Sequence, residues 1–240
     1  MYDLTPRQID ILKNIVKEYI DTAQPIGSET LEKKFDLGVS PATIRNEMAE
    51  MVRLGYLSKP HSSSGRTPTS KAIKFYINEL MKEKEMSVAE EVEAKEKIWD
   101  LREKREGFLR AATKNLAQKT HSLAVALTDE GDIFYSGYSN ILEMPEFYDI
   151  DITKNLLNIL DDISYFDKIM RRLENECSVF LEDDFDEEIL KPYGFVFSRF
   201  ETHGNHIGTI GVIGPCRMQY DLVIPVVRYF GNLVHEVADW

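Results

Sequence analysis

The first 60 residues hold three helical apolar patterns in a fixed order, and this order limits the fold more than any other feature of the chain. In "TPRQIDILKNIVKEYI", Thr5 suits the N-cap, Pro6 suits the first helical position and Gln8 completes a capping box. A shorter helix begins at Ser28 and ends near "DLGVS", which reads as a tight turn containing Gly38. Two helices therefore precede this turn.

A third helix follows the turn directly. In "SPATIRNEMAEMVRLGYL", Ser40 caps the helix, Gly55 stops it, and "YLSK" begins a short strand. A short second helix, a tight turn and a capped third helix are typical of a helix-turn-helix, and the strand with a polar loop behind it favours the winged variant. The alternative is a plain three-helix cap whose polar side chains only face solvent.

The outward face of the third helix carries side chains that suit DNA. In a helix-turn-helix, this helix enters the major groove by its N-terminal turns. Arginine and asparagine can make paired contacts with guanine and adenine edges, and hydroxyl groups bind phosphates or bases. The outward positions are Ser40, Thr43, Arg45, Asn46, Ala49 and Arg53.

The stretch "KPHSSSGRTPTSK", residues 59–71, reads either as a linker or as a DNA-contacting wing. It follows a capped third helix and a short strand, which is where a wing must lie. Small hydroxyl side chains and Gly65 allow close approach to a phosphate backbone, and Arg66 supplies positive charge. Pro60 and Pro68 stiffen its two ends. We interpret the stretch as a wing.

Charge is spread unevenly along the chain, whose 29 basic and 41 acidic residues give a net charge of −12. Residues 1–82 hold 12 basic and 10 acidic residues, whereas the remainder holds 17 basic and 31 acidic residues. An acidic total argues against nucleic acid, because DNA binding is dominated by neutralisation of phosphates. The asymmetry instead indicates a nucleic-acid-facing module joined to an acidic one, with chance variation in surface charge as the alternative.

The rest of the chain predicts a connecting helix and an α+β domain. Residues 83–119 are dense in both charge signs, and Lys95 and Arg102 occupy the heptad positions that follow Val88, which spoils a coiled-coil seam. We expect one long exposed helix there, either a solvated spacer or a self-associating element. After residue 121 the apolar period becomes that of strands, with a hairpin turn inside "SLAVALTDEGDIFYSGYSNIL", further strands and a closing helix. The predicted domains are residues 1–82, 83–119 and 120–240.

No set of residues forms a convincing catalytic, cofactor or metal site, so we predict a protein that is not an enzyme. "GTIGVIG" and "GRTPTSK" lack the spacing of nucleotide-binding loops. His203, His206 and Cys216 match no zinc pattern, and the acidic run at 182–188 lacks the glycine of a calcium loop. Two cysteines, a polar N-terminus and no long apolar run predict a cytoplasmic protein that does not bind membranes.

Three longer segments carry a resemblance to a known family. They are "ATIRNEMAEMVRLGYLSKPHSSSGRTPTSKAIKFYINELM", "SGYSNILEMPEF" and "GTIGVIGPCRMQYDLVIPVV". Together they resemble the HrcA heat-inducible transcription repressors. The resemblance implies an N-terminal winged helix-turn-helix and a C-terminal GAF-like domain with an antiparallel sheet. It also implies repression of chaperone genes by a homodimer on an inverted-repeat operator, with a GroEL-type chaperonin as a further partner.

The resemblance also assigns DNA-binding residues, position by position. On the recognition helix they are Ser40, Thr43, Arg45 and Asn46, with Arg53 more peripheral; on the wing they are Lys59, His61, Ser62, Ser63, Ser64 and Arg66. In "CRMQY", we expect Arg217 and Tyr220 to fix the turn between the last strand and the last helix.

The chain departs from the family pattern in one respect. Family members carry a dimerisation domain inserted in the GAF-like domain, whereas here residues 128–132 replace the insert. The connecting helix, at Val92 and Trp99, or the GAF-like surface would then have to supply a dimer interface. The alternative function is a ligand-sensing or protein-interaction module whose winged helix does not read DNA.

Overall fold

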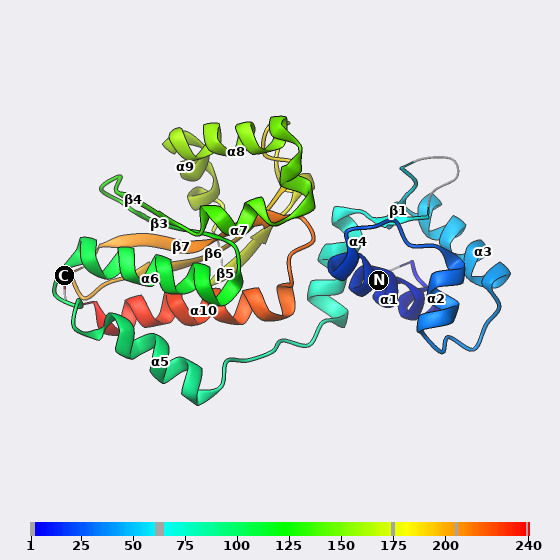
Figure 1. Cartoon of the computed structure of the whole chain (residues 1–240), viewed down its shortest axis with the longest axis horizontal. Helices are drawn as coiled ribbons and strands as arrows, with labels where there is room; N and C mark the ends of the chain where they lie inside the picture. The colour runs from blue at the N-terminus through cyan, green and yellow to red at the C-terminus, as the bar shows by residue number, and fades with distance from the viewer. Residues whose placement is uncertain (1–2, 61–64, 174–175, 205, 239) are drawn as a thin grey trace. The chain divides into compact units, whose positions relative to one another are not determined.

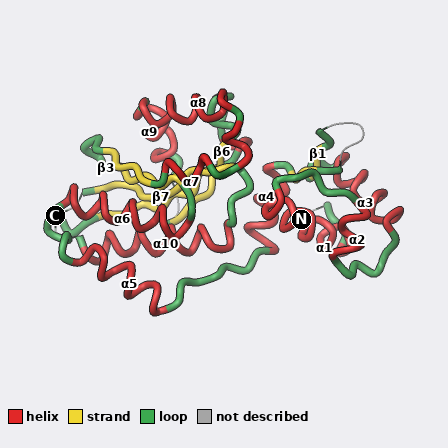
Figure 2. The backbone as a smooth tube through the Cα atoms, viewed as in Figure 1, coloured by secondary structure: helices red, strands yellow, loops and turns green. Residues whose placement is uncertain are grey.

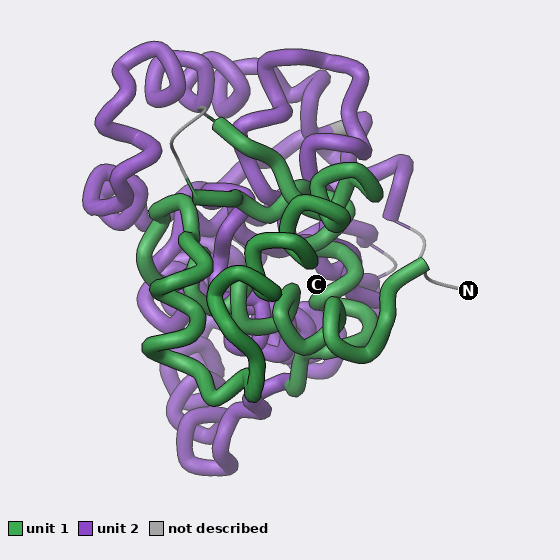
Figure 3. The backbone as a smooth tube through the Cα atoms, turned by 90° about the vertical axis from the view of Figure 1, so that its right-hand side faces the viewer, with its two compact units in different colours: residues 1–82 green, residues 83–240 purple. Residues whose placement is uncertain are grey.

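The computed structural model describes residues 3–60, 65–173, 176–204, 206–238 and 240. Its contacts divide the chain into two compact units, residues 1–82 and residues 83–240, which Figure 3 draws in separate colours. Among the described residues, no helix combines the length and the apolar character that a bilayer-crossing segment needs.

The first unit is a winged helix-turn-helix, as the sequence predicts. Its elements in Figure 1 are α1 (Pro6–Thr22), α2 (Ser28–Lys34), α3 (Pro41–Arg53), β1 (Leu57–Ser58), β2 (Thr67–Pro68), α4 (Ser70–Phe75) and the π-helical turn η1 (Tyr76–Leu80). The capping box of Thr5 and Gln8 is present at the start of α1. The turn before α3 and the end of α3 contain Gly38 and Gly55, whose φ angles of 63° and 79° favour glycine.

One apolar core joins the three helices and the wing strands of this unit. Each helix turns a buried face inward, with Leu12 on α1, Leu31 on α2 and Ile44 on α3 all fully buried. The strand residue Leu57 belongs to the same core, which fixes the base of the wing to the helices. Burial of one face of α3 leaves its opposite face free for another partner.

The second unit is an α+β domain. Its elements are α5 (Val88–Trp99), α6 (Arg105–Thr120), β3 (Leu123–Thr128), β4 (Ile133–Ser136), α7 (Tyr138–Leu142), η2 (Pro145–Tyr148), α8 (Ile150–Asp161), α9 (Ile163–Arg171), β5 (Cys177–Phe180), η3 (Glu182–Asp184), β6 (Tyr193–Glu201), β7 (Ile207–Pro215) and α10 (Tyr220–Val237). The five strands form one antiparallel sheet in the order β4-β3-β7-β6-β5. The predicted hairpin is the β3–β4 connection.

Helices cover both faces of this sheet. Figure 2 shows α6 and α10 along one face of the yellow strands and α8 and α9 across the other. Beneath α8 and α9, Leu156 and Phe166 pack in one core with Phe195 of the sheet. Burial on both faces explains why β3 and β7 read as continuous apolar runs.

The prediction of a single long helix over residues 83–119 is wrong. Residues 81–87 lie outside any helix, and residues 100–104 separate α5 from α6. The break lets both helices bury an apolar face, since Ile98 of α5 and Leu116 of α6 are fully buried and the two helices contact each other. Both helices belong to the second unit.

Two of the quoted family segments meet in this unit. The Tyr220 hydroxyl donates to the Cys216 carbonyl at 2.7 Å, so this tyrosine braces the turn before α10, as expected. Arg217 reaches η2, where its Nε and Nη2 atoms donate to the two carboxylate oxygens of Glu146 at 2.5 and 3.0 Å. The pair links "SGYSNILEMPEF" to "CRMQY".

Candidate nucleic-acid interface

The N-terminal turn of α3 is fixed by its cap. The backbone N–H of Thr43 donates to Ser40 Oγ at 3.3 Å, and the two hydroxyl oxygens lie 3.1 Å apart. Ser40 is exposed and Thr43 is half-buried. Both hydroxyl groups therefore lie at the end of the helix, where the partial positive charge of the helix dipole favours an anion.

The exposed face of α3 carries polar side chains without internal partners. Arg45 and Asn46 are exposed, and the structure shows no hydrogen bond or ion pair between either side chain and a described residue. An exposed guanidinium and an exposed amide beside each other can bind phosphates or base edges without first breaking an internal contact.

Arg53, at the other end of α3, is engaged within the helix. Its guanidinium donates to both carboxylate oxygens of Glu50 at 2.5 to 3.1 Å. The Arg53 hydrogen bonds lower the pKa of Glu50, and those to Glu50 raise the pKa of Arg53. To contact another partner with the same donors, Arg53 must open this pair.

The base of the wing is tied to the end of α3. Thr69 Oγ1 donates to the Gly55 carbonyl at 2.7 Å, and Lys71 Nζ donates to the Leu54 carbonyl at 3.0 Å. Lys71 also lies 4.2 Å from the centre of the Tyr56 ring. These contacts make Lys71 a structural residue of the wing base.

A second anchor holds the returning limb of the wing against the segment before α2. Ile26 and Arg66 exchange two backbone hydrogen bonds of 2.8 Å each. A Cβ atom at Gly65 would lie 2.5 Å from the carbonyl carbon and oxygen of Ile26. Glycine is therefore required at residue 65, because any side chain would meet backbone that cannot yield easily.

A hollow of about 430 Å³ opens between α3, the wing and the start of α2. It brings together three of the predicted residues, Arg45, Lys59 and Arg66, whose side chains give it a basic lining. Arg66 is half-buried, and its Nη1 atom donates to the Gly65 carbonyl at 3.3 Å. Arg53 does not line the hollow. His61, Ser62, Ser63 and Ser64 lie outside the described residues.

Sequence reasoning missed the contribution of α2 to this hollow. Glu29 and Thr30 are exposed in its lining, next to the buried Ser28. Their position in the first turn of the helix before the tight turn is the signal that would have found Thr30, because in helix-turn-helix proteins that helix crosses the DNA backbone.

The described residues hold no group of three or more histidine, cysteine or acidic side chains arranged to bind a metal ion. Burial raises the pKa of Cys177 and of Cys216 to about 12, so both thiols stay protonated at neutral pH and are poor nucleophiles. The hollow itself suits an anion, because Arg45, Lys59 and Arg66 line it.

Two family models match the chain. Residues 3–86 match the winged helix-turn-helix transcription repressor model, HrcA DNA-binding, and residues 61–224 match the HrcA protein C terminal domain. The chain belongs to the HrcA family. The resemblance drawn from the sequence is confirmed, and the HrcA family consists of transcription repressors rather than enzymes.

Heat-inducible transcription repressors named HrcA match this chain over nearly its whole length. The heat-inducible transcription repressor HrcA of Halalkalibacterium halodurans is 24% identical over 329 aligned positions, which cover 95% of this chain and 96% of the relative. That of Pelotomaculum thermopropionicum is 26% identical, with 98% and 97% covered. An alignment of 329 positions exceeds the 240 residues of this chain by 89, so the relative has at least 89 positions without a counterpart here.

A solved structure shares the fold. The crystal structure of a hypothetical protein matches with a TM-score of 0.79 at 18% sequence identity, and the match covers 98% of each chain. At this identity the match supports the arrangement of helices and strands alone.

Proposed function

We propose that this HrcA-family chain is a sequence-specific repressor of heat-shock genes that binds an inverted-repeat operator as a homodimer in the cytoplasm. The observation that carries the proposal is the basic hollow, where Arg45, Lys59 and Arg66 converge beside the exposed face of α3. The curated relatives are named heat-inducible transcription repressors, which supports heat-shock genes as the target.

Each predicted residue has a proposed role on DNA. Arg45 and Asn46 read base edges in the major groove, because paired donors and acceptors distinguish guanine and adenine there. Ser40 and Thr43 hold a phosphate at the start of α3, while Lys59 and Arg66 hold the backbone beside the wing. His61, Ser62, Ser63 and Ser64 are proposed to extend the wing contact, and Arg53 lies at its periphery.

We further propose that the second unit is GAF-like. Its five-stranded antiparallel sheet with helices on both faces supports this. Aromatic side chains belong to the core that the sheet shares with α8, and in it the rings of Phe147 from η2 and Tyr193 from β6 stack with centroids 6.1 Å apart. A GroEL-type chaperonin is proposed as a partner on the family resemblance alone.

Selection of bound duplexes from a random pool tests the proposed function. We expect enrichment of an inverted repeat, with the selected duplex bound at least about a thousand-fold more tightly than a scrambled one. The logarithm of the binding constant should fall linearly with the logarithm of salt concentration, with a slope of roughly −0.9 per phosphate contacted. A pool without enrichment would instead favour the ligand-sensing or protein-interaction module.

A further inference from the structure

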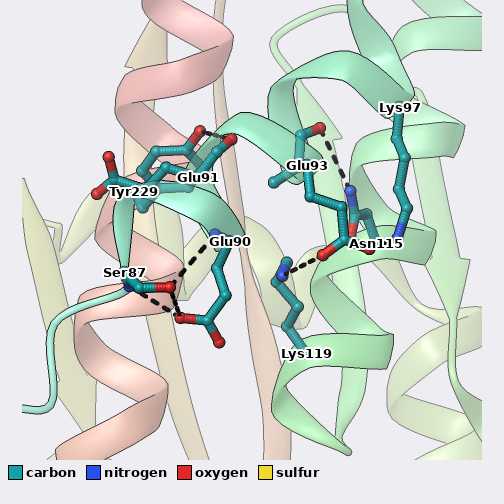
Figure 4. Close-up of polar contacts among 9 residues, drawn as sticks. Ser87, Glu90, Glu91, Glu93, Lys97, Asn115, Lys119 and Tyr229 are labelled. Atoms are coloured by element: carbon teal, nitrogen blue, oxygen red, sulfur yellow. Dashed lines mark hydrogen bonds and ion pairs between the residues drawn. The ribbon is translucent and has the colours of Figure 1, made fainter.

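Helix α5 is attached to the second unit by one side only. Figure 4 shows this side, where the Tyr229 hydroxyl of α10 donates to the Glu91 carbonyl at 2.7 Å and Asn115 Nδ2 of α6 donates to the Ala94 carbonyl at 3.4 Å. Lys119 lies 3.4 Å from Glu93, and a Ser87–Glu90 capping box fixes the first turn. Because Ala94 and Ile98 are fully buried beneath it, α5 is a fixed part of the unit.

The outward side of α5 carries three large apolar side chains among charged ones. Val88, Val92 and Trp99 are 75%, 49% and 44% exposed, and their spacing of four and seven residues places them in one row on the helix. A helix that already buries one face on its own domain normally presents polar side chains to water. A row of three exposed large apolar side chains therefore marks a surface for a partner.

The charges beside this row have both signs. Lys95 lies between Val92 and Trp99, with its Nζ atom 5.6 Å from the Trp99 ring centre. A shallow hollow of about 470 Å³ is lined by Val92, Lys95, Glu96, Trp99 and Asp100. The one ion pair of Lys95 among the described residues is with Glu236 at 4.0 Å, and both side chains are exposed, so it holds the lysine weakly.

We propose that α5 is the self-association surface of this chain, pairing antiparallel with α5 of a second copy across a two-fold axis between residues 95 and 96. That axis brings Val92 against Trp99 of the other copy and Lys95 against Glu96 of the other copy, each twice. Four of the five side chains that line the hollow, Val92, Lys95, Glu96 and Trp99, are thus complementary to themselves, as an isologous interface requires. The inference rests on the proposed function, since it names the partner that makes the repressor a dimer.

Charge also decides between the two exposed apolar regions of the unit. The second region includes Leu142, Tyr148 and Ile150, which are 55%, 71% and 74% exposed. Residues 138–163 hold six acidic residues and one basic residue, Lys154. Two copies meeting through this region would have one lysine each to offset six acidic residues, whereas α5 holds two lysines against four glutamates and sets Lys95 against Glu96 in the proposed pairing.

The size of the α5 surface sets the expected affinity of the dimer. A helix of 12 residues buries less area against a copy of itself than the 1,200 Å² or so of a standard stable interface. The free chain should therefore dimerise weakly, with a dissociation constant in the micromolar range, roughly 1 to 100 µM. Binding of both copies to adjacent half-sites on DNA would then raise the overall affinity that the weak contact alone provides.

Sedimentation equilibrium of the full chain without DNA tests the proposal, and its result does not depend on whether the chain binds an operator. We expect the average mass to rise from one chain toward two over the micromolar range. Val92→Glu should weaken the dimer at least about ten-fold, because it places a charge in an apolar contact. The matched control is Leu157→Glu, which adds the same charge at an equally exposed apolar position on α8 and should change nothing.

A charge exchange at residues 95 and 96 is the more specific test. Lys95→Glu sets glutamate against glutamate, and Glu96→Lys sets lysine against lysine, so each should weaken the dimer several-fold. The double variant restores opposite charges and should return to within about three-fold of the original dissociation constant. The proposal is overturned if the chain stays monomeric at about 100 µM, if Val92→Glu associates normally, or if the double variant is as weak as the single ones.

Discussion

Helices α3 and α5 both bury one face in their own unit and expose the other, but the exposed faces differ in kind. On α3, Arg45 and Asn46 stand in solvent without a partner among the described residues. On α5, Val92 and Trp99 stand in solvent beside a lysine and a glutamate. The difference indicates different partners, because uncompensated cations suit a polyanion and an apolar row with both charge signs suits a copy of itself.

The strongest test of this comparison is whether a substitution on α3 weakens DNA binding and leaves self-association unchanged. Arg45→Ala should weaken operator binding about 5- to 150-fold, since one paired base contact is worth roughly 1–3 kcal/mol. It should also relax the base preference and leave the sedimentation of the free chain unchanged. Fluorescence anisotropy with selected and scrambled duplexes measures both. Loss of self-association in Arg45→Ala, with DNA binding intact, would reverse the roles of the two helices.

A smaller effect is expected where the wing is anchored. Gly65→Ala forces a methyl group against the Ile26 backbone, which should open the bridge between Ile26 and Arg66 at a cost of about 1–3 kcal/mol. Hydrogen exchange should then accelerate about ten-fold or more at the Ile26 and Arg66 amides. Gly27→Ala is the matched control, because its new methyl group makes only an ordinary contact with Thr30, 3.8 Å away. Equal protection in both variants would contradict the anchor.

Arg66→Ala should act on DNA of any sequence alike. Its removal takes one positive charge from the hollow and leaves the backbone bridge to Ile26 in place. We expect binding of selected and scrambled duplexes to weaken several-fold together, and the salt slope to become shallower by about one unit. Titrations at four salt concentrations measure the slope. A change confined to the selected duplex would make Arg66 a base-reading residue.

The smallest effect is expected at Arg53. Because its guanidinium is held by Glu50, Arg53→Ala should change operator affinity by no more than about two-fold, the scale of an exposed ion pair. The same anisotropy titration measures this. A loss as large as that of Arg45→Ala would mean that the Glu50 pair opens on DNA and that both ends of α3 bind alike.

The winged helix could be predicted because its signals are local. The capping box of α1, the Ser40 cap and the glycines that end the turn and α3 each act within a few residues. The break between α5 and α6 could not be predicted. The segment "DLREK" contains no glycine or proline, and the break at residues 100–104 follows from packing of α5 on α6. Tertiary burial overrode a helical pattern there.

Part of the candidate site could not be predicted from the sequence either. The outward position of Arg45 follows from helical spacing, so its exposure was predictable. The pairing of Ile26 with Arg66 joins residues 40 positions apart through backbone groups, which leave no pattern in side-chain types. From the sequence, Gly65 is expected to allow close approach to DNA, whereas the structure gives it an internal neighbour, the Ile26 backbone.

The central proposal is that the exposed face of α3 that carries Arg45 and Asn46 reads DNA sequence. Its most direct measurement is the ratio of affinities for the selected inverted repeat and for a scrambled duplex, taken at one salt concentration for the unmodified chain and for Arg45→Ala. We expect a ratio of at least about a thousand for the unmodified chain and a ratio at least about five-fold smaller for the variant. An unmodified chain that binds both duplexes equally, or a variant with the same ratio, would contradict the proposal.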